Sequence, residues 1–334
     1  MTPRTLRSFA RRVAHAVRAA PVLSALVLAL GSPLPLVGAA EPAPLRFGFA
    51  ADAFVQVNEN DARAALKVWA QTLGAERGIP VDPNLDILAD TRAIKAAFQA
   101  GRVDAVTMLT EQFWALRREI AFGSLILGRT RGETTEVYLL LVHRDLAAAR
   151  LADLRGKSLT ILDGARGSLA AVWAETLLLE GNLGSADSFW GKSARVNKIS
   201  RVVLPVFFKQ VDACVVTRDG FRTMCELNPQ LGIQLRMVAQ SPAFVPAVFC
   251  FRDELVSAYR DRLVAEIGDV AGTVAGRQTL TLFQSEQLVA RPMSDLDASC
   301  ALLDRHQRLL RERGTSNAPP SSGVAREGDE KGRR

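Results

Sequence analysis

The sequence predicts an α/β protein with two lobes, each a mostly parallel β-sheet flanked by helices. Short apolar runs alternate with segments of helical spacing along both halves of the chain, as in sheets that helices cover on both faces. A weak repeat links the halves, because Val103-Asp104-Ala105 and Val211-Asp212-Ala213 are each followed eight positions later by an acidic residue and ten positions later by phenylalanine. The repeat indicates two units of the same construction.

The first half alternates strands and helices in a regular order. Apolar runs predict strands at residues 45–50, 85–89, 103–108 and 136–143. Helical spacing predicts helices at residues 61–77, 92–100 and 110–119. Gly78 and Gly101 end the first two helices, and Asp90-Thr91 caps the start of the second.

The second half opens with a strand at residues 158–162 and a glycine-containing turn at residues 163–167. A helix follows, with Ser168 as its expected N-cap and Gly181 as its expected left-handed C-cap. Such a helix start offers free N–H groups to an anion, and Arg166 adds a full positive charge beside it. The alternative is that Ser168 only caps its own helix.

The remaining elements continue the alternation. Strands are predicted at residues 211–217, 235–239 and 248–251, and helices at residues 202–208 and 219–227. From residue 253 to about residue 313 the chain is predicted to be helical, with breaks near residues 272–276 and 291–294. The tail from Gly314 has no apolar periodicity, which predicts disorder.

The first forty residues are typical of a secretory signal peptide. A basic region precedes an apolar run at residues 22–30, and small residues at positions 37–40 provide a cleavage site before Glu41. An uncleaved membrane anchor is the alternative, but the apolar run is shorter than a bilayer span needs. Of the 42 basic side chains, five lie in this segment, so the remaining 37 nearly balance the 35 acidic ones. This balance gives no reason to expect nucleic acid as a partner.

Catalytic motifs are absent from the sequence. The three histidines, His15, His143 and His306, have no metal-ligand spacing, and no CxxC occurs. Ser168 lacks the second glycine of a G-x-S-x-G nucleophile elbow, and no phosphate-binding loop of the Walker type is present. The sequence therefore predicts a protein that is not an enzyme and that needs no metal or cofactor.

The four cysteines allow three disulfide pairings of all four, and the sequence does not choose among them. Cys214 and Cys250 lie in apolar strand-like runs, and Cys225 and Cys300 lie elsewhere. Buried thiols are therefore the favoured interpretation.

Candidate ligand-binding residues follow the predicted strands, because ligands of parallel sheets meet the loops at the carboxyl ends of strands. Thr91 and Ser168 provide helix-start hydroxyls in different halves, so two lobes can close on one anionic solute. Each hydroxyl alone is more typical of a helix cap. The candidates are Asp52, Thr91, Arg92, Arg166, Gly167, Ser168, Thr217, Arg218 and Asp219.

Several segments, in order, resemble the PhnD-like solute-binding proteins of phosphate, phosphite and phosphonate ABC importers. They are AIKAAFQAGRVDAVTM (93–108), LADLRGKSLTILDGARGS (151–168), VVLPVFFKQVDACVVTRDGFRTMCELNPQL (202–231), VAQSPAFVPAVFCFRDEL (238–255) and GRQTLTLFQSEQLVARPMSDLD (276–297). The resemblance extends over about residues 45–310.

The resemblance implies a two-lobed type II periplasmic binding protein fold with two hinge crossings. Lobe 1 would comprise residues 41–135 plus 246–312, and lobe 2 residues 136–245 with the crossings. The signal peptide would occupy residues 1–40 and a disordered tail residues 313–334. The mature protein would be a periplasmic monomer that closes on ligand and docks on an ABC permease in the inner membrane.

The chain departs from the family pattern at the site. Where phosphonate-binding members carry a Ser/Thr-rich turn, this sequence reads Ala165-Arg166-Gly167-Ser168, and Asp219 corresponds to an acidic residue of the family. A second acid has no counterpart in residues 243–247, and a histidine has none in residues 196–201. The sequence thus predicts an exported solute-binding protein for a small anionic, phosphate- or phosphonate-like solute. The alternatives are a sensing subunit that presents ligand to a membrane receptor and, more remotely, an exported hydrolase.

Overall fold

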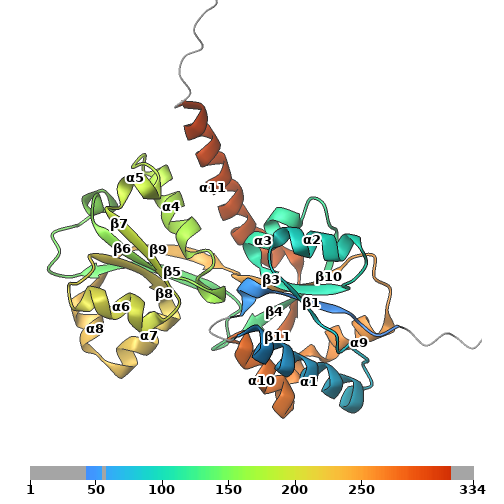
Figure 1. Ribbon diagram of the computed structural model, residues 1–334. Helices are drawn as coiled ribbons and strands as arrows, with labels where there is room; N and C mark the ends of the chain where they lie inside the picture. The colour runs from blue at the N-terminus through green and yellow to red at the C-terminus, as the bar shows by residue number, and fades with distance from the viewer. Residues whose placement is uncertain (1–42, 55–57, 317–334) are drawn as a thin grey trace, which may run out of the picture. The chain divides into compact units, whose positions relative to one another are not determined.

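The computed structural model describes residues 43–54 and 58–316 (Figure 1). The predicted signal peptide, residues 1–40, lies outside the described residues, as do residues 317–334 of the predicted tail. The last helix, α11 (Asp297–Ser316), extends into that tail, so residues 313–316 are helical where the sequence predicted disorder.

One sheet has six strands in the order β11-β4-β10-β3-β1-β2. Its strands are β1 (Phe47–Ala50), β2 (Asp86–Leu88), β3 (Ala105–Leu109), β4 (Phe122–Arg129), β10 (Ala247–Arg252) and β11 (Gln287–Arg291). The helices α1 (Glu59–Arg77), α9 (Ala258–Glu266) and α10 (Val274–Leu282) cover one face, and α2 (Thr91–Gln99) and α3 (Thr110–Leu116) cover the other (Figure 1). Apolar side chains of the helices pack on both faces of the sheet and bury them.

The other sheet has five strands in the order β7-β6-β8-β5-β9. Its strands are β5 (Glu136–His143), β6 (Ser158–Leu162), β7 (Lys192–Val196), β8 (Ala213–Thr217) and β9 (Leu235–Phe244). The helices α4 (Ala170–Glu180), α5 (Ala186–Phe189), α6 (Ile199–Phe207), α7 (Arg218–Leu227) and α8 (Gln230–Gln234) flank it. α11 packs against α4 and adds Leu302 and Leu303 to the core on that face.

Short 3-10 segments connect several elements. They are η1 (Ala51–Ala53), η2 (Leu151–Leu154), η3 (Ala165–Gly167), η4 (Ile267–Gly272) and η5 (Met293–Leu296). The strand β11 lies in the region from residue 253 onward that the sequence predicted as helical, so that prediction is wrong there.

The predicted α/β class with two helix-flanked sheets is confirmed, but the sheets are mixed rather than mostly parallel. β1 pairs in parallel with β2 and β3, and β6 pairs in parallel with β7 and β8. The strands β10, β4 and β11 extend the first sheet in antiparallel pairings, and β5 and β9 do the same in the second.

The aspartates of the internal repeat make the same kind of hydrogen bond in both sheets. Asp104 precedes β3, and its carboxylate accepts a hydrogen bond from the backbone N–H of Arg46, which precedes β1, at 3.0 Å. Asp212 precedes β8 and accepts one from the N–H of Ser158, the first residue of β6, at 2.8 Å. Each aspartate therefore fixes the start of a parallel strand pair.

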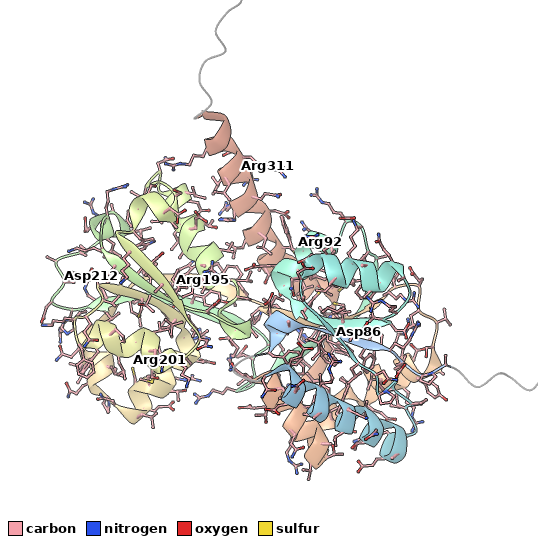
Figure 2. All side chains as sticks on the ribbon, viewed as in Figure 1. Asp86, Arg92, Arg195, Arg201, Asp212 and Arg311 are labelled. Atoms are coloured by element: carbon pink, nitrogen blue, oxygen red, sulfur yellow. The ribbon has the colours of Figure 1, made fainter. Side chains whose placement is uncertain are left out.

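Replacing Asp104 by asparagine should lower the free energy of unfolding by about 2 kcal/mol, because its buried carboxylate is ion-paired with Arg46 at 2.7 Å and with Arg252 at 3.0 Å. Urea unfolding of the purified variant measures this. The control is Asp86→Asn, which removes a partly exposed pair with Arg102 and should cost less than about 0.5 kcal/mol (Figure 2). Equal losses for the two variants would contradict the structural role of Asp104.

Candidate functional site

A cavity of about 440 Å³ lies at the carboxyl ends of β6, β7 and β8. β6 leads through a turn and η3 into α4, β7 leads through a short turn into α6, and β8 continues directly into α7. The starts of helices carry backbone N–H groups without intrahelical partners, so they present partial positive charge. The lining residues include Asp163, Arg166, Lys198, Ile199, Ser200, Thr217, Asp219 and Gly220.

The charged side chains of this cavity are mainly positive. Arg131, Arg166 and Lys198 line it together with two acids, Asp163 and Asp219. Both acids face arginines that do not line the cavity.

The two acids are partly neutralised from outside the cavity. A guanidinium nitrogen of Arg195 lies 3.8 Å from the carboxylate of Asp163. Asp219 lies 3.3 Å from a guanidinium nitrogen of Arg222 and 3.9 Å from Nε of Arg218. Figure 2 shows Arg195 at the opposite end of the five-stranded sheet from Asp212, as expected for the carboxyl ends of its strands. The cavity is therefore suited to an anion more than to a cation.

Strand β5 holds Arg166 at two points. The hydroxyl of Tyr138 donates a hydrogen bond to the backbone carbonyl of Arg166 at 3.0 Å. The guanidinium of Arg166 donates from Nε to Oε1 of Glu136 and forms an ion pair with the same carboxylate. Glu136 is 6 % exposed, so the positive charge predicted as an anion ligand has a buried counter-charge that the sequence analysis did not identify.

Burial raises the pKa of Glu136 to about 7, while the positive charge of Arg166 acts in the opposite direction. Near neutral pH the carboxyl group therefore exchanges between an ionised form, which neutralises Arg166, and a protonated form, which leaves the guanidinium charge available.

Ser168 does not cap a helix, so that expectation is wrong. α4 begins at Ala170 after η3, with Leu169 in the N-cap position, and the hydroxyl of Ser168 donates to the carbonyl of Pro246 at 2.9 Å. At the other end, Gly181 is the C-cap but has φ of −78°, and the left-handed conformation falls on Asn182.

Gly167 is fixed by close packing of the turn, because a Cβ at this position would meet the carbonyl oxygen of Leu162 well inside van der Waals contact. We expect Gly167→Ala to lower the free energy of unfolding by about 1–3 kcal/mol, since neither the backbone of the turn nor that of Leu162 can move at low energetic cost. Gly272→Ala, at a glycine with no atom within 4 Å of the added carbon, is the matched control and should be close to neutral. Chemical denaturation compares them, and a neutral Gly167→Ala would refute the packing argument.

The structure brings three predicted candidates, Arg166, Thr217 and Asp219, into one cavity. The hydroxyl of Thr217 accepts from the N–H of Gly220 at 3.2 Å, so it also caps α7. Gly167 and Ser168 continue the turn next to Arg166 without lining the cavity.

The other candidates lie elsewhere. Arg218 is half exposed at the start of α7 and does not line the cavity. Asp52 lies in η1 and accepts from Nε2 of Gln112 at 3.4 Å. Thr91 and Arg92 begin α2, where the predicted cap is provided by Asp90, which accepts from Ala93 N at 2.8 Å (Figure 2).

A second, smaller cavity of about 100 Å³ adjoins the first, since Ala165, Arg166 and Gln284 line both. Glu136 lines the smaller one as well. Most of its other lining residues are apolar, among them the aromatic side chains of Phe49, Trp69, Phe249 and Phe283.

No metal site and no bilayer-spanning helix is found within the described part of the chain. There, no three His, Cys, Asp or Glu side chains cluster so as to hold a metal ion, and no helix combines sufficient length with sufficient apolar content to span a bilayer. The four cysteines are free thiols, with Cys214 and Cys250 buried as predicted, and burial raises the pKa of Cys214 to about 12.

Solved structures show the same fold. XAC2383 from Xanthomonas citri bound to ATP matches with a TM-score of 0.57 and 18% identity, over 80% of this chain and 98% of that one. PhnD1 from Prochlorococcus marinus in complex with methylphosphonate matches with a TM-score of 0.52 and 14% identity, over 81% and 100% of the two chains. A binding protein component of an ABC phosphonate transporter, PA3383 from Pseudomonas aeruginosa, matches with a TM-score of 0.54 and 16% identity, over 83% and 90%.

The sequence also matches a defined family. A search of curated proteins finds no match. Residues 53–296 match the family described as ABC transporter, phosphonate, periplasmic substrate-binding protein. Its members are binding proteins rather than enzymes, in agreement with the sequence prediction. Because the match covers most of the chain, the protein belongs to the family of periplasmic substrate-binding proteins of phosphonate ABC transporters.

Proposed function

We propose that this protein captures a small anionic solute of the phosphate or phosphonate type in the periplasm and delivers it to an ABC permease in the inner membrane. The observation that carries the proposal is the 440 Å³ cavity at the starts of α6 and α7, lined by Arg131, Arg166 and Lys198. Converging backbone N–H groups and positive side chains are the usual means by which proteins bind oxyanions.

Two structural neighbours support a phosphorus oxyanion as the solute. The Xanthomonas citri protein was solved with ATP and the Prochlorococcus marinus protein with methylphosphonate, and both ligands carry such groups. In this chain the N–H groups of Ile199 and Ser200 would donate hydrogen bonds to the oxygens, and the charges of Arg166 and Lys198 would attract them. Asp219 would orient Arg222, which it faces at 3.3 Å.

The two sheets would be the cores of two lobes, with residues 41–135 plus 246–312 in lobe 1 and residues 136–245 in lobe 2. The chain crosses between them twice, and the crossings pair with each other, Glu136 opposite Phe244. Pro246, just past the second crossing, accepts from the hydroxyl of Ser168 and from the N–H of Thr110, one from each lobe. These contacts support a hinge at the two crossings, with α11 of lobe 1 packed on the lobe 2 helix α4.

A thermal-shift screen over phosphate, phosphite, methylphosphonate, ATP, sulfonates and small carboxylates tests the proposal. A phosphorus oxyanion should raise the melting temperature in a concentration-dependent manner. Lys198→Ala should weaken binding about fivefold, since an exposed ammonium contributes about 1 kcal/mol to a charge-assisted contact. Lys209→Ala, which removes a lysine paired with Asp145 instead, is the matched control. Absence of any anion-dependent shift would reject the proposed function.

A further inference from the structure

The smaller cavity, of about 100 Å³, extends from Arg166 into the apolar core of the six-stranded sheet. Its walls include Phe49, Phe249 and Phe283, and the rings of Phe49 and Phe283 stack with centroids 5.7 Å apart. α1 and α10 pack against each other over this region and contribute Trp69 and Thr279 to the lining. A packed protein interior rarely leaves an empty cavity of this size, so we expect a ligand to fill it.

Two polar atoms in the walls have no partner among the described residues. Nε1 of Trp69 and Oγ1 of Thr279 are buried without a hydrogen bond to any of residues 43–54 and 58–316, and each side chain belongs to a residue only 5 % exposed. Leaving a buried donor or acceptor unsatisfied is costly, and native proteins do so rarely. Both orphaned atoms belong to residues that line the same cavity.

The chemistry of the walls restricts what the cavity can hold. An indole N–H only donates, so the group that faces Trp69 must be an acceptor, while the hydroxyl of Thr279 can donate or accept. The aromatic walls exclude an ionised group, because its desolvation would have no compensation. A cavity of about 150 Å³ holds a benzene molecule, so this one suits a chain of about five heavy atoms.

We propose that this cavity is a second ligand subsite, for a short aliphatic substituent that carries one uncharged oxygen as a hydrogen-bond acceptor. The inference rests on the proposed function, because an anionic group bound at Arg166 would direct its substituent through the shared boundary of the two cavities. Glu136 and Arg166 lie at this boundary and Trp69 and Thr279 line the inner part.

Isothermal titration calorimetry with two phosphonates of matched shape tests the subsite. In 2-methoxyethylphosphonate an ether oxygen replaces one methylene group of butylphosphonate. The protein should bind the ether about tenfold more tightly, because the oxygen accepts from Trp69, which the alkyl chain leaves unpaired. Along the series from methyl- to butylphosphonate, affinity should rise by up to about fourfold per methylene group.

Three variants assign the preference to its residues. Trp69→Phe keeps an aromatic wall and removes the donor, and Thr279→Val keeps the shape and removes the hydroxyl. Each should reduce the ratio of the ether affinity to the butylphosphonate affinity at least threefold, with both affinities measured on the same variant. Trp173→Phe, at a buried tryptophan in the core of the other sheet, should leave the preference intact. An ether preference that survives both Trp69→Phe and Thr279→Val would overturn the inference.

A neutral probe separates this inference from the proposed function. Tetrahydrofuran carries an ether oxygen and no anionic group, so it can report on the cavity even if no phosphonate binds. Its addition should shift the indole N–H resonance of Trp69 in a nitrogen–proton correlation spectrum, and the resonance lost in Trp69→Phe identifies the signal. A shift of the Trp69 resonance in a protein that binds no phosphonate would support the subsite and contradict the proposal of an anionic solute. No shift, together with phosphonate affinities independent of the substituent, would reject the subsite alone.

Discussion

Glu136→Gln is expected to raise the affinity for methylphosphonate by up to about tenfold near pH 8, where the native carboxylate is mostly ionised. The carboxylate of Glu136, which lines the smaller cavity, is ion-paired with Arg166, which lines both cavities, so it neutralises the guanidinium and repels an incoming anion. Glutamine has almost the same shape, still accepts a hydrogen bond from Arg166 and carries no charge. The measurement is the dissociation constant by calorimetry.

The same substitution should flatten the pH dependence of binding. The pKa of Glu136 is raised to about 7, so lowering the pH through this value protonates the carboxyl group and frees Arg166 to bind the anion. Native affinity should therefore rise from about pH 8 to about pH 6 relative to that of Glu136→Gln, in which only the titration of the probe itself remains. Glu133→Gln, which removes an exposed carboxylate from the rim of the smaller cavity, is the control and should keep the native profile. Parallel profiles for the native protein and Glu136→Gln would show that Glu136 does not regulate the site.

Of the two residues in this ion pair, only Arg166 was identified from the sequence. Arg166 lies in a glycine-containing turn between a strand and a helix, and that local pattern identified it as a ligand candidate. Glu136 begins an apolar strand thirty residues earlier, and nothing in its neighbourhood indicates that its side chain faces Arg166. Contacts between separate strands and turns depend on tertiary packing, so spacing along the chain cannot reveal them.

The elements that the sequence analysis missed have related physical causes. β7 is an edge strand whose residues are almost all exposed, so Lys192–Val196 has no apolar run to mark it. Without β7, the start of α6 with Lys198 was not recognised as part of the site. β4 was not predicted as a strand, and whether β5 and β10 pair in parallel or antiparallel depends on tertiary packing, which local periodicity does not encode. The cap prediction for Ser168 failed for the same reason, because its hydroxyl donates to the carbonyl of Pro246, a distant residue, instead of capping the helix.

Arg166→Met should lower the free energy of unfolding by about 1.4 kcal/mol near pH 8, because it leaves the buried carboxylate of Glu136 without its partner, and protonating that group costs about 1.4 kcal/mol for each pH unit above its native pKa of about 7. Methionine preserves most of the apolar stem, so loss of packing contributes little. A carboxyl group with a raised native pKa contributes stability at pH values below its unfolded pKa of about 4.5, and this contribution is lost as the pH rises through the native pKa. In the native protein that window runs from pH 4.5 to about pH 7, the native pKa of Glu136, and removal of the arginine extends it upward.

The variant should consequently be close to native stability near pH 5, where Glu136 is protonated, and about 1.4 kcal/mol less stable than the native protein near pH 8. The double variant Glu136→Gln/Arg166→Met removes both charges and should recover most of the loss near pH 8, since a neutral pair has no uncompensated ion to desolvate. Urea unfolding at both pH values provides the four free energies. If Arg166→Met were equally destabilised at the two pH values, the loss would come from packing, and the buried carboxylate would not be the group that makes Arg166 necessary. If instead the penalty follows the ionisation of Glu136, the arginine that neutralises this carboxylate is the same one proposed to receive the anion, and ligand binding and fold stability depend on one proton.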